Sequence, residues 1–184
     1  MRLPNLVRGS VGMLLLASLS GCTPTDAPAP PEPISTFVAP YATDEEALAA
    51  AEVAYAEYVR VSSEILNEGG VNPERLAEVV TGEFLESSIE GLKEFHDAGR
   101  TQSGASKIGA SELQRYSPTG GPREIVTIYV CRNISEVGVF DSSGISIVAP
   151  ERADSSTMQV TFDYVEAGEA LLVSDQLLWG DGEC

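Results

Sequence analysis

The sequence predicts an α+β domain in which helices come first and an antiparallel sheet follows. Apolar residues recur at helical spacing from about residue 43 to residue 98. After Gly99 the period changes, and apolar and polar residues alternate as they do in strands. The helical runs all precede the strand runs instead of being interleaved with them, which favours segregated helices and an antiparallel sheet over a parallel one.

The first helix is predicted to begin at a capping box and to end at a glycine pair. Thr43-Asp44-Glu45-Glu46 places a hydroxyl and a carboxylate where they satisfy free amides of the first turn. The helix should end at about Asn67, because Gly69-Gly70 follows it. The residues at helical spacing on its apolar side are Leu48, Ala51, Tyr55, Val59, Ser62 and Leu66.

Two further helices are expected before the sheet. Asn72-Pro73 reads as an N-cap followed by proline at the first helical position, and it predicts a short helix through Val80. The next helix should start near Thr81 and end at Ala98-Gly99. Its inward positions are predicted to be Leu85, Ser88 or Ile89, Leu92 and Phe95.

The strands are predicted from alternation. In the segment 124–134, Val126, Ile128 and Val130 alternate with Thr127, Tyr129 and Cys131. Both sets are apolar enough to favour a central strand that is covered on both faces. Residues 137–148 predict two short strands about an Asp141–Gly144 turn, and residues 158–164 alternate strictly. A turn at 166–169 leads into a last strand, in which Leu171, Val173, Leu177 and Trp179 share one face. A weaker, polar strand is expected between Ser103 and Tyr116.

The first 21 residues have the layout of a secretory signal peptide. Arg2 and Arg8 precede an apolar run, Val11 to Leu19, that is too short to span a bilayer. The segment Leu19-Ser20-Gly21-Cys22 resembles the bacterial lipoprotein cleavage box. That resemblance implies a diacylglyceryl group on the Cys22 thiol and cleavage before it. The alternative is an ordinary secretory signal that happens to precede a cysteine.

Residues 22–42 are predicted to be a tether, and 43–184 a single domain. Five of the ten residues from Pro24 to Pro33 are proline, which favours an extended spacer of about 30 Å. A proline-rich ligand for a recognition domain is the alternative. Loss of the leader removes two arginines, which takes the formal net charge from −17 to −19. This charge excludes nucleic acid as a partner and repels anionic lipid headgroups.

Helices followed by a curved sheet whose last strand carries a tryptophan resemble the nuclear transport factor two-like fold, a cystatin-like cone. In particular, the chain resembles small secreted actinobacterial lipoproteins with one cysteine on a central strand, here Cys131, and one at the C-terminus, here Cys184. With Cys22 lipidated, these two form an even pair in an oxidising compartment, and we predict their disulfide. A buried free Cys131 and a frayed C-terminus are the alternative.

Catalytic and metal-binding motifs are not evident. The chain has one histidine, His96, and lacks the GxSxG, HExxH and CxxC patterns, so no metal and no cofactor are predicted. His96 is expected near the end of the third helix, partly exposed, where a positive charge is favoured by the helix dipole.

The cone-fold resemblance implies a pocket between helices and sheet, as in cone-fold enzymes such as ketosteroid isomerase. Candidate residues for it are Tyr55, Tyr58, His96, Tyr129, Phe162 and Trp179, with Asp163 and Asp175 as possible acids. The alternative is that these residues are simply core.

The function expected is that of a non-enzymatic binding module, anchored by lipid to the extracellular face of the cell membrane. Its partner would be a small apolar ligand or an exported or envelope protein. The alternative is a small cone-fold isomerase, dehydratase or hydrolase acting on an apolar substrate. An open pocket with two convergent polar groups would favour the enzyme, and a filled cone would disfavour it.

Overall fold

The computed structural model describes residues 37–181 and Cys184. The predicted signal peptide, Cys22 and most of the predicted tether therefore lie outside the described residues. The helical part consists of α1 (Asp44–Asn67), the 3-10 helix η1 (Pro73–Glu78) and α2 (Gly82–Asp97). The strands that follow are β1 (Thr101–Ser103), β2 (Lys107–Tyr116), β3 (Val126–Asn133), β4 (Gly138–Phe140), β5 (Ser155–Val165) and β6 (Ala170–Asp181). The predicted α+β order is confirmed.

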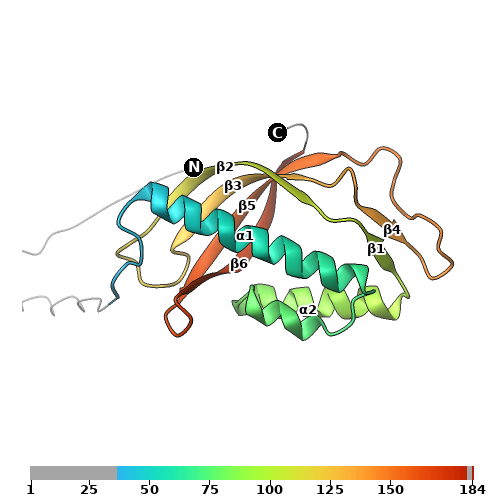
Figure 1. The fold of residues 1–184 in the computed structure, drawn as a ribbon, viewed down its shortest axis with the longest axis horizontal. Helices are drawn as coiled ribbons and strands as arrows, with labels where there is room; N and C mark the ends of the chain where they lie inside the picture. The colour runs from blue at the N-terminus through green and yellow to red at the C-terminus, as the bar shows by residue number, and fades with distance from the viewer. Residues whose placement is uncertain (1–36, 182–183) are drawn as a thin grey trace, which may run out of the picture. The chain divides into compact units, whose positions relative to one another are not determined.

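The main sheet is antiparallel throughout, with the strand order β2-β3-β5-β6. Register shifts interrupt the β2–β3 pairing twice and the β5–β6 pairing twice, and such irregularities bend and twist a sheet. The sheet is accordingly curved, and α1 crosses one of its faces while α2 lies beside it, next to β6 (Figure 1). We call the helix-covered side the inner face and the opposite side the outer face. The short strands β1 and β4 form a separate two-stranded ribbon.

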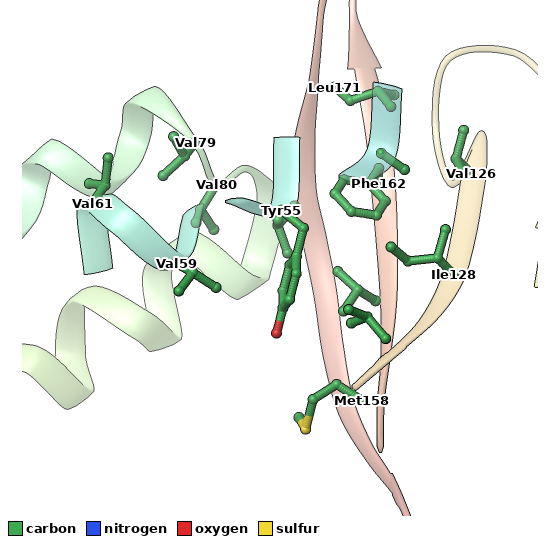
Figure 2. Packing of buried hydrophobic residues seen from close by; sticks show 14 of the residues in the cluster. Tyr55, Val59, Val61, Val79, Val80, Val126, Ile128, Met158, Phe162 and Leu171 are labelled. Carbon is green, nitrogen blue, oxygen red and sulfur yellow. The ribbon is translucent and has the colours of Figure 1, made fainter. Parts of the chain in front are cut away.

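The core lies between α1 and the inner face of the sheet. Ala47, Ala51, Tyr55 and Val59 recur every fourth residue along α1 and are buried. They belong to one apolar cluster with inward side chains of β3, β5 and β6 (Figure 2). The sheet residues with at most 1% exposure in this cluster are Val126, Ile128, Val130, Val160, Phe162 and Val173. Burying a side chain such as Phe162 contributes about 1.5–3 kcal/mol.

The capping box of α1 is present in a slightly shifted form. Thr43 Oγ1 accepts a hydrogen bond from the Glu46 amide at 3.2 Å, as predicted. The Glu46 carboxylate accepts from the amide of Ala42 at 2.8 Å, one residue before the N-cap. Both bonds satisfy amides at the start of the helix, where no carbonyl of a preceding turn is available.

The prediction for the second helix was wrong in type. Residues 73–78 form a 3-10 helix, and Asn72 has a φ of 53° without a capping bond from its side chain. Gly69 and Gly70 also have positive φ, so the chain reverses sharply after α1. Asparagine tolerates the left-handed region better than most residues, and it completes this reversal instead of capping a helix.

Helix α2 has the predicted bounds but a thinner buried face. Of the predicted inward positions only Leu92 is buried. The others are half-buried: Leu85, Ser88, Ile89 and Phe95. The cause is the position of α2, which packs on η1 and on the edge strand β6.

Two strand predictions need correction. Helices cover β3 on its inner face only, and the outward Tyr129 and Cys131 are half-buried. Residues 137–148 give one short strand, β4, which pairs with β1. The second half contributes only an isolated bridge between Phe140 and Ser146. A carboxylate oxygen of Asp141 accepts hydrogen bonds from two backbone amides in this turn. These bonds hold the turn in place without a second strand.

The domain begins before the predicted boundary at residue 43. The Tyr116 hydroxyl donates to the Tyr41 carbonyl at 2.7 Å and lies 3.3 Å from the Tyr41 amide, which donates to it. The Phe37 ring meets the Tyr164 ring edge-on, with 6.3 Å between centroids. Residues that the sequence assigned to the tether therefore pack on the ends of β2 and β5.

Candidate functional site

The predicted disulfide is present. Cys131 and Cys184 are bonded at an S–S distance of 2.09 Å, and their Cα atoms are 5.6 Å apart. A Cβ added to Gly109 would lie 3.1 Å from Cys131 Cβ, so the glycine leaves room for the bridge. The bond ties the C-terminus to β3, the second strand of the sheet.

The six residues predicted to line one pocket are divided among three places. Tyr55 and Phe162 are fully buried in the core. Tyr58 is half-buried beside them, and its ring stacks on that of Tyr55 at 5.7 Å. His96 lies in the last turn of α2, as predicted, and its Nδ1 is 2.9 Å from the Gly69 carbonyl oxygen.

The remaining two residues, Tyr129 and Trp179, lie on the outer face. Their ring centroids are 4.9 Å apart, and Trp179 is 61% exposed. Tyr129 on β3 and Trp179 on β6 thus form an aromatic pair that no helix covers. The six side chains do not meet in a common cavity.

The space between helices and sheet is filled where the pocket was predicted. The Tyr55 hydroxyl donates a hydrogen bond to Gln176 Oε1 at 3.1 Å. Burial raises the pKa of Tyr55 and of Tyr58 above the ordinary value of 10.0, so both phenols are neutral near pH 7. Tyr55 serves as a hydrogen-bond donor that joins α1 to β6.

A polar groove of about 620 Å³ opens on the outer face. Its floor consists of Thr127 on β3 with Gln159 and Thr161 on β5. The two threonine hydroxyls are 3.3 Å apart and share a hydrogen bond across the strands. Strand alternation explains this floor, because Gln159, Thr161 and Asp163 point away from the core that Val160 and Phe162 enter.

The first wall of the groove is the loop between β2 and β3. The Glu124 amide donates to Asp163 Oδ1 at 2.6 Å, and Arg123 Nε lies 3.9 Å from Asp163 Oδ2. Arg115 Nη2 pairs with Glu124 Oε2 at 3.3 Å. Glu124 has a φ of 48°, a backbone conformation that costs energy in a non-glycine residue and is held here by these contacts. The loop is therefore fixed over the end of β5.

The second wall is formed by β6 and the start of α2. The Thr81 amide donates to the Val173 carbonyl at 2.9 Å, and the Val173 amide donates to the Val79 carbonyl at 3.0 Å. These bonds dock the chain before α2 on the free edge of β6. Glu83 consequently lines the groove together with Ser174 and Asp175.

The charges of the groove disfavour anions. Four acids line it, namely Glu83, Glu124, Asp163 and Asp175, against Arg115 and Arg123. Both arginines already face acids in ion pairs. A neutral or cationic polar ligand therefore suits the groove better than a phosphate.

Within the described part of the chain, no group of three potential metal ligands is found.

A second hollow, of about 400 Å³, lies between α1 and the turn that joins β5 to β6. Its lining includes the aliphatic residues Val53, Ala54 and Leu171, with Tyr41 from the docked N-terminal segment. Val53 is 72% exposed.

The helices in the described ranges, 37–181 and 184, include none with the length and apolarity needed to cross a membrane.

Sequence reasoning named Asp163 and Asp175 as possible acids but assigned them to a pocket on the inner face. It missed Arg115, Arg123, Gln159 and Thr161. The signal was present in β5, because the polar members of an alternating strand mark the face opposite the core. The arginines lie in or beside an irregular loop, and no periodicity places such residues.

Comparisons with known proteins bear on the fold. No protein-family model matches the chain, and no curated protein is similar to it in sequence. A designed β-sheet protein is matched with a TM-score of 0.31 at 14% identity, over 76% of this chain and 92% of that one. The intermembrane space region of the chloroplast protein ARC6 is matched with a TM-score of 0.54 at 12% identity, over 73% of this chain and 97% of that one. The chain is thus similar in fold to that region.

Proposed function

We propose that the protein is a lipid-anchored binding module on the extracellular face of the cell membrane, with a cone-like domain of the nuclear transport factor two type. The leader that ends at Cys22 supports the anchor. The Cys131–Cys184 disulfide supports an oxidising compartment outside the cytoplasm. Helices packed on one face of a curved antiparallel sheet support the cone-like fold.

The ligand site of this module is the groove on the outer face. The observation that carries this proposal is a hollow of about 620 Å³, lined by charged and polar side chains, on the sheet face that the helices leave open. Its volume lies in the range of small-molecule sites. Its lining also changes the expected ligand from apolar to polar, because the side chains of Glu83 and Gln159 need hydrogen-bonding partners when water is displaced.

Binding of an apolar ligand or an exported protein is the second candidate. It is favoured by the hollow beside Val53, whose lining is largely aliphatic. The enzymatic alternative has less support. It needs an open cone interior, and the side chains of Tyr55, Ile128, Val160 and Phe162, none of them exposed, occupy the space between α1 and the sheet.

Native mass spectrometry of the protein extracted from its own membranes in mild detergent tests the ligand site. We expect a reproducible small-molecule adduct that is lost or reduced in the double variant Gln159→Ala/Asp175→Asn. Asp97→Asn is the matched control, because Asp97 is an exposed acid at the end of α2, outside the groove. An adduct that survives the double variant would move the site elsewhere, and no adduct from native membranes would contradict the proposal.

A further inference from the structure

The polar groove continues into an aromatic surface. In the sheet register, Gln159 pairs with Tyr129 on one side and with Leu177 on the other. Gln159 lines the groove, so Tyr129, Leu177 and Trp179 border it on the outer face. We call these three residues the aromatic platform.

Two of the three large side chains of the platform are exposed to solvent. Trp179 is 61% exposed and Leu177 is 53% exposed. Trp179 is the single tryptophan of the chain. Exposed apolar side chains that lie together and are bordered by polar residues mark interaction sites. The disulfide at Cys184 follows Trp179 by a few residues, so it holds the end of β6 near Tyr129.

An apolar ring face beside a groove of donors and acceptors matches one ligand chemistry. The C–H faces of a sugar ring pack on aromatic rings, while its hydroxyl groups both donate and accept hydrogen bonds. Asp163 and Asp175 offer acceptors, and Gln159 offers both a donor and an acceptor. The excess of acids in the groove disfavours anionic sugars.

We infer that the outer face binds a neutral or amino-substituted oligosaccharide. One ring stacks on Trp179 and the hydroxyl groups of the next ring enter the groove past Gln159. This inference rests on the proposed function, because it names the ligand class for the same groove.

Strand addition by a peptide at the β6 edge is less favoured. The Gln176 amide already donates to the Asp175 carboxylate at 2.9 Å. The Val173 amide and carbonyl are already bonded to the segment before α2. A peptide would have to displace these contacts to pair with the strand.

Titration with neutral and anionic oligosaccharides tests the inference. The probes are maltotetraose, mannotetraose, chitotetraose and, as the anionic comparison, trigalacturonate. Because Trp179 is the single tryptophan, its fluorescence reports on the platform directly. We expect at least one neutral probe to shift the emission of Trp179 with saturation, and trigalacturonate to bind about tenfold more weakly or not at all.

Calorimetry on variants then places the site. Trp179→Ala should weaken binding about tenfold or more, as expected for loss of a stacking residue. Leu178→Ala is the matched control, because Leu178 is 59% exposed on the same strand but pairs with Met158, an inward residue. We expect its affinity to stay within about twofold of wild type.

The outcomes separate the two proposals. If no probe binds and the native adduct is not a saccharide but still depends on Gln159 and Asp175, the saccharide inference is overturned and the proposed groove stands. If the wild-type protein binds no probe and carries no native adduct, the saccharide inference and the proposed groove are both overturned. Sugar binding that Trp179→Ala leaves unchanged also overturns the inference.

Discussion

The Tyr55 hydroxyl on α1 donates a hydrogen bond to Gln176 Oε1 on β6, over 3.1 Å. Tyr55 is fully buried, and Gln176 lies just beyond a register shift that ends the apolar inward run of β6. The neutral phenol of Tyr55 therefore joins α1 to the edge strand β6, at the point where the apolar inward run of β6 ends.

Substitution of Tyr55 by phenylalanine should have opposite effects at neutral and alkaline pH. Near pH 7, Tyr55→Phe loses one hydrogen bond, at a cost of about 1 kcal/mol in the free energy of unfolding. Burial raises the pKa of Tyr55 above 10.0, so the unfolded chain releases the phenolic proton first as the pH rises. The stability that the raised pKa contributes is complete below pH 10 and is lost above it.

Urea unfolding at several pH values checks this prediction. The wild type should lose stability steeply above pH 10, and Tyr55→Phe should lose it more gradually, with Tyr58 still contributing. Parallel curves for the two proteins would show that Tyr55 ionises as easily in the folded state as in the unfolded one.

Removal of the Cys131–Cys184 bond should destabilise the domain strongly. The bond closes a sequence separation of 53 residues, for which the chain-entropy relation gives about 4 kcal/mol. We expect the double variant Cys131→Ser/Cys184→Ser to unfold at lower urea concentration with a similar slope. Its Trp179 emission should also move toward that of a solvated indole, because the end of β6 is no longer fixed near Tyr129. A wild-type protein in which both cysteines react with a thiol reagent without prior reduction would argue against the bond itself.

The anchor prediction concerns Cys22 alone among the three cysteines. Cys22→Ala should remove the acyl groups from the intact mass and shift the protein from the detergent phase to the aqueous phase in a partition experiment. The serine double variant of the other two cysteines is the control, and it should stay in the detergent phase. If Cys22→Ala also partitions into detergent, the protein is held at the membrane by something other than this thiol.

The sequence was informative where periodicity and caps determine structure. The bounds of α1 and α2, the alternation of β5 and the antiparallel order all follow from local patterns of residues. The disulfide was predicted from the resemblance and the cysteine count, and the Cys131 and Cys184 side chains do meet. These features depend on short-range spacing or on a pairing with few possible partners.

The site was less predictable because it depends on which face of the sheet the helices cover. Tyr129 and Phe162 alternate alike in sequence, yet Phe162 is fully buried and Tyr129 lies in the uncovered outer layer. Trp179 was expected to share a face with Leu171 and Val173. Register shifts in the β5–β6 pairing intervene, and Trp179 is exposed where the other two are buried. A one-residue shift moves every following side chain to the other face, and a sequence pattern does not show it.

Two glycines near α2 should respond to alanine with opposite signs. Gly70 has a φ of 79°, and a Cβ there would lie 2.6 Å from the Leu92 carbonyl oxygen and 3.2 Å from His96 Cβ. Gly91 lies within α2 without a positive φ, and a Cβ added to it would meet open space. The first substitution adds strain where the turn after α1 packs on α2, and the second only improves helix propensity.

We expect Gly70→Ala to lower the free energy of unfolding by about 2 kcal/mol or more, from the left-handed backbone and the close contact together. Gly91→Ala should raise it by up to about 1 kcal/mol. Urea unfolding of the two variants beside the wild type measures both. Because the same side chain is added on two neighbouring parts of the fold, a shared sign would indicate a general response to added methyl groups. It would contradict the close packing of the Gly70 turn against the last turns of α2.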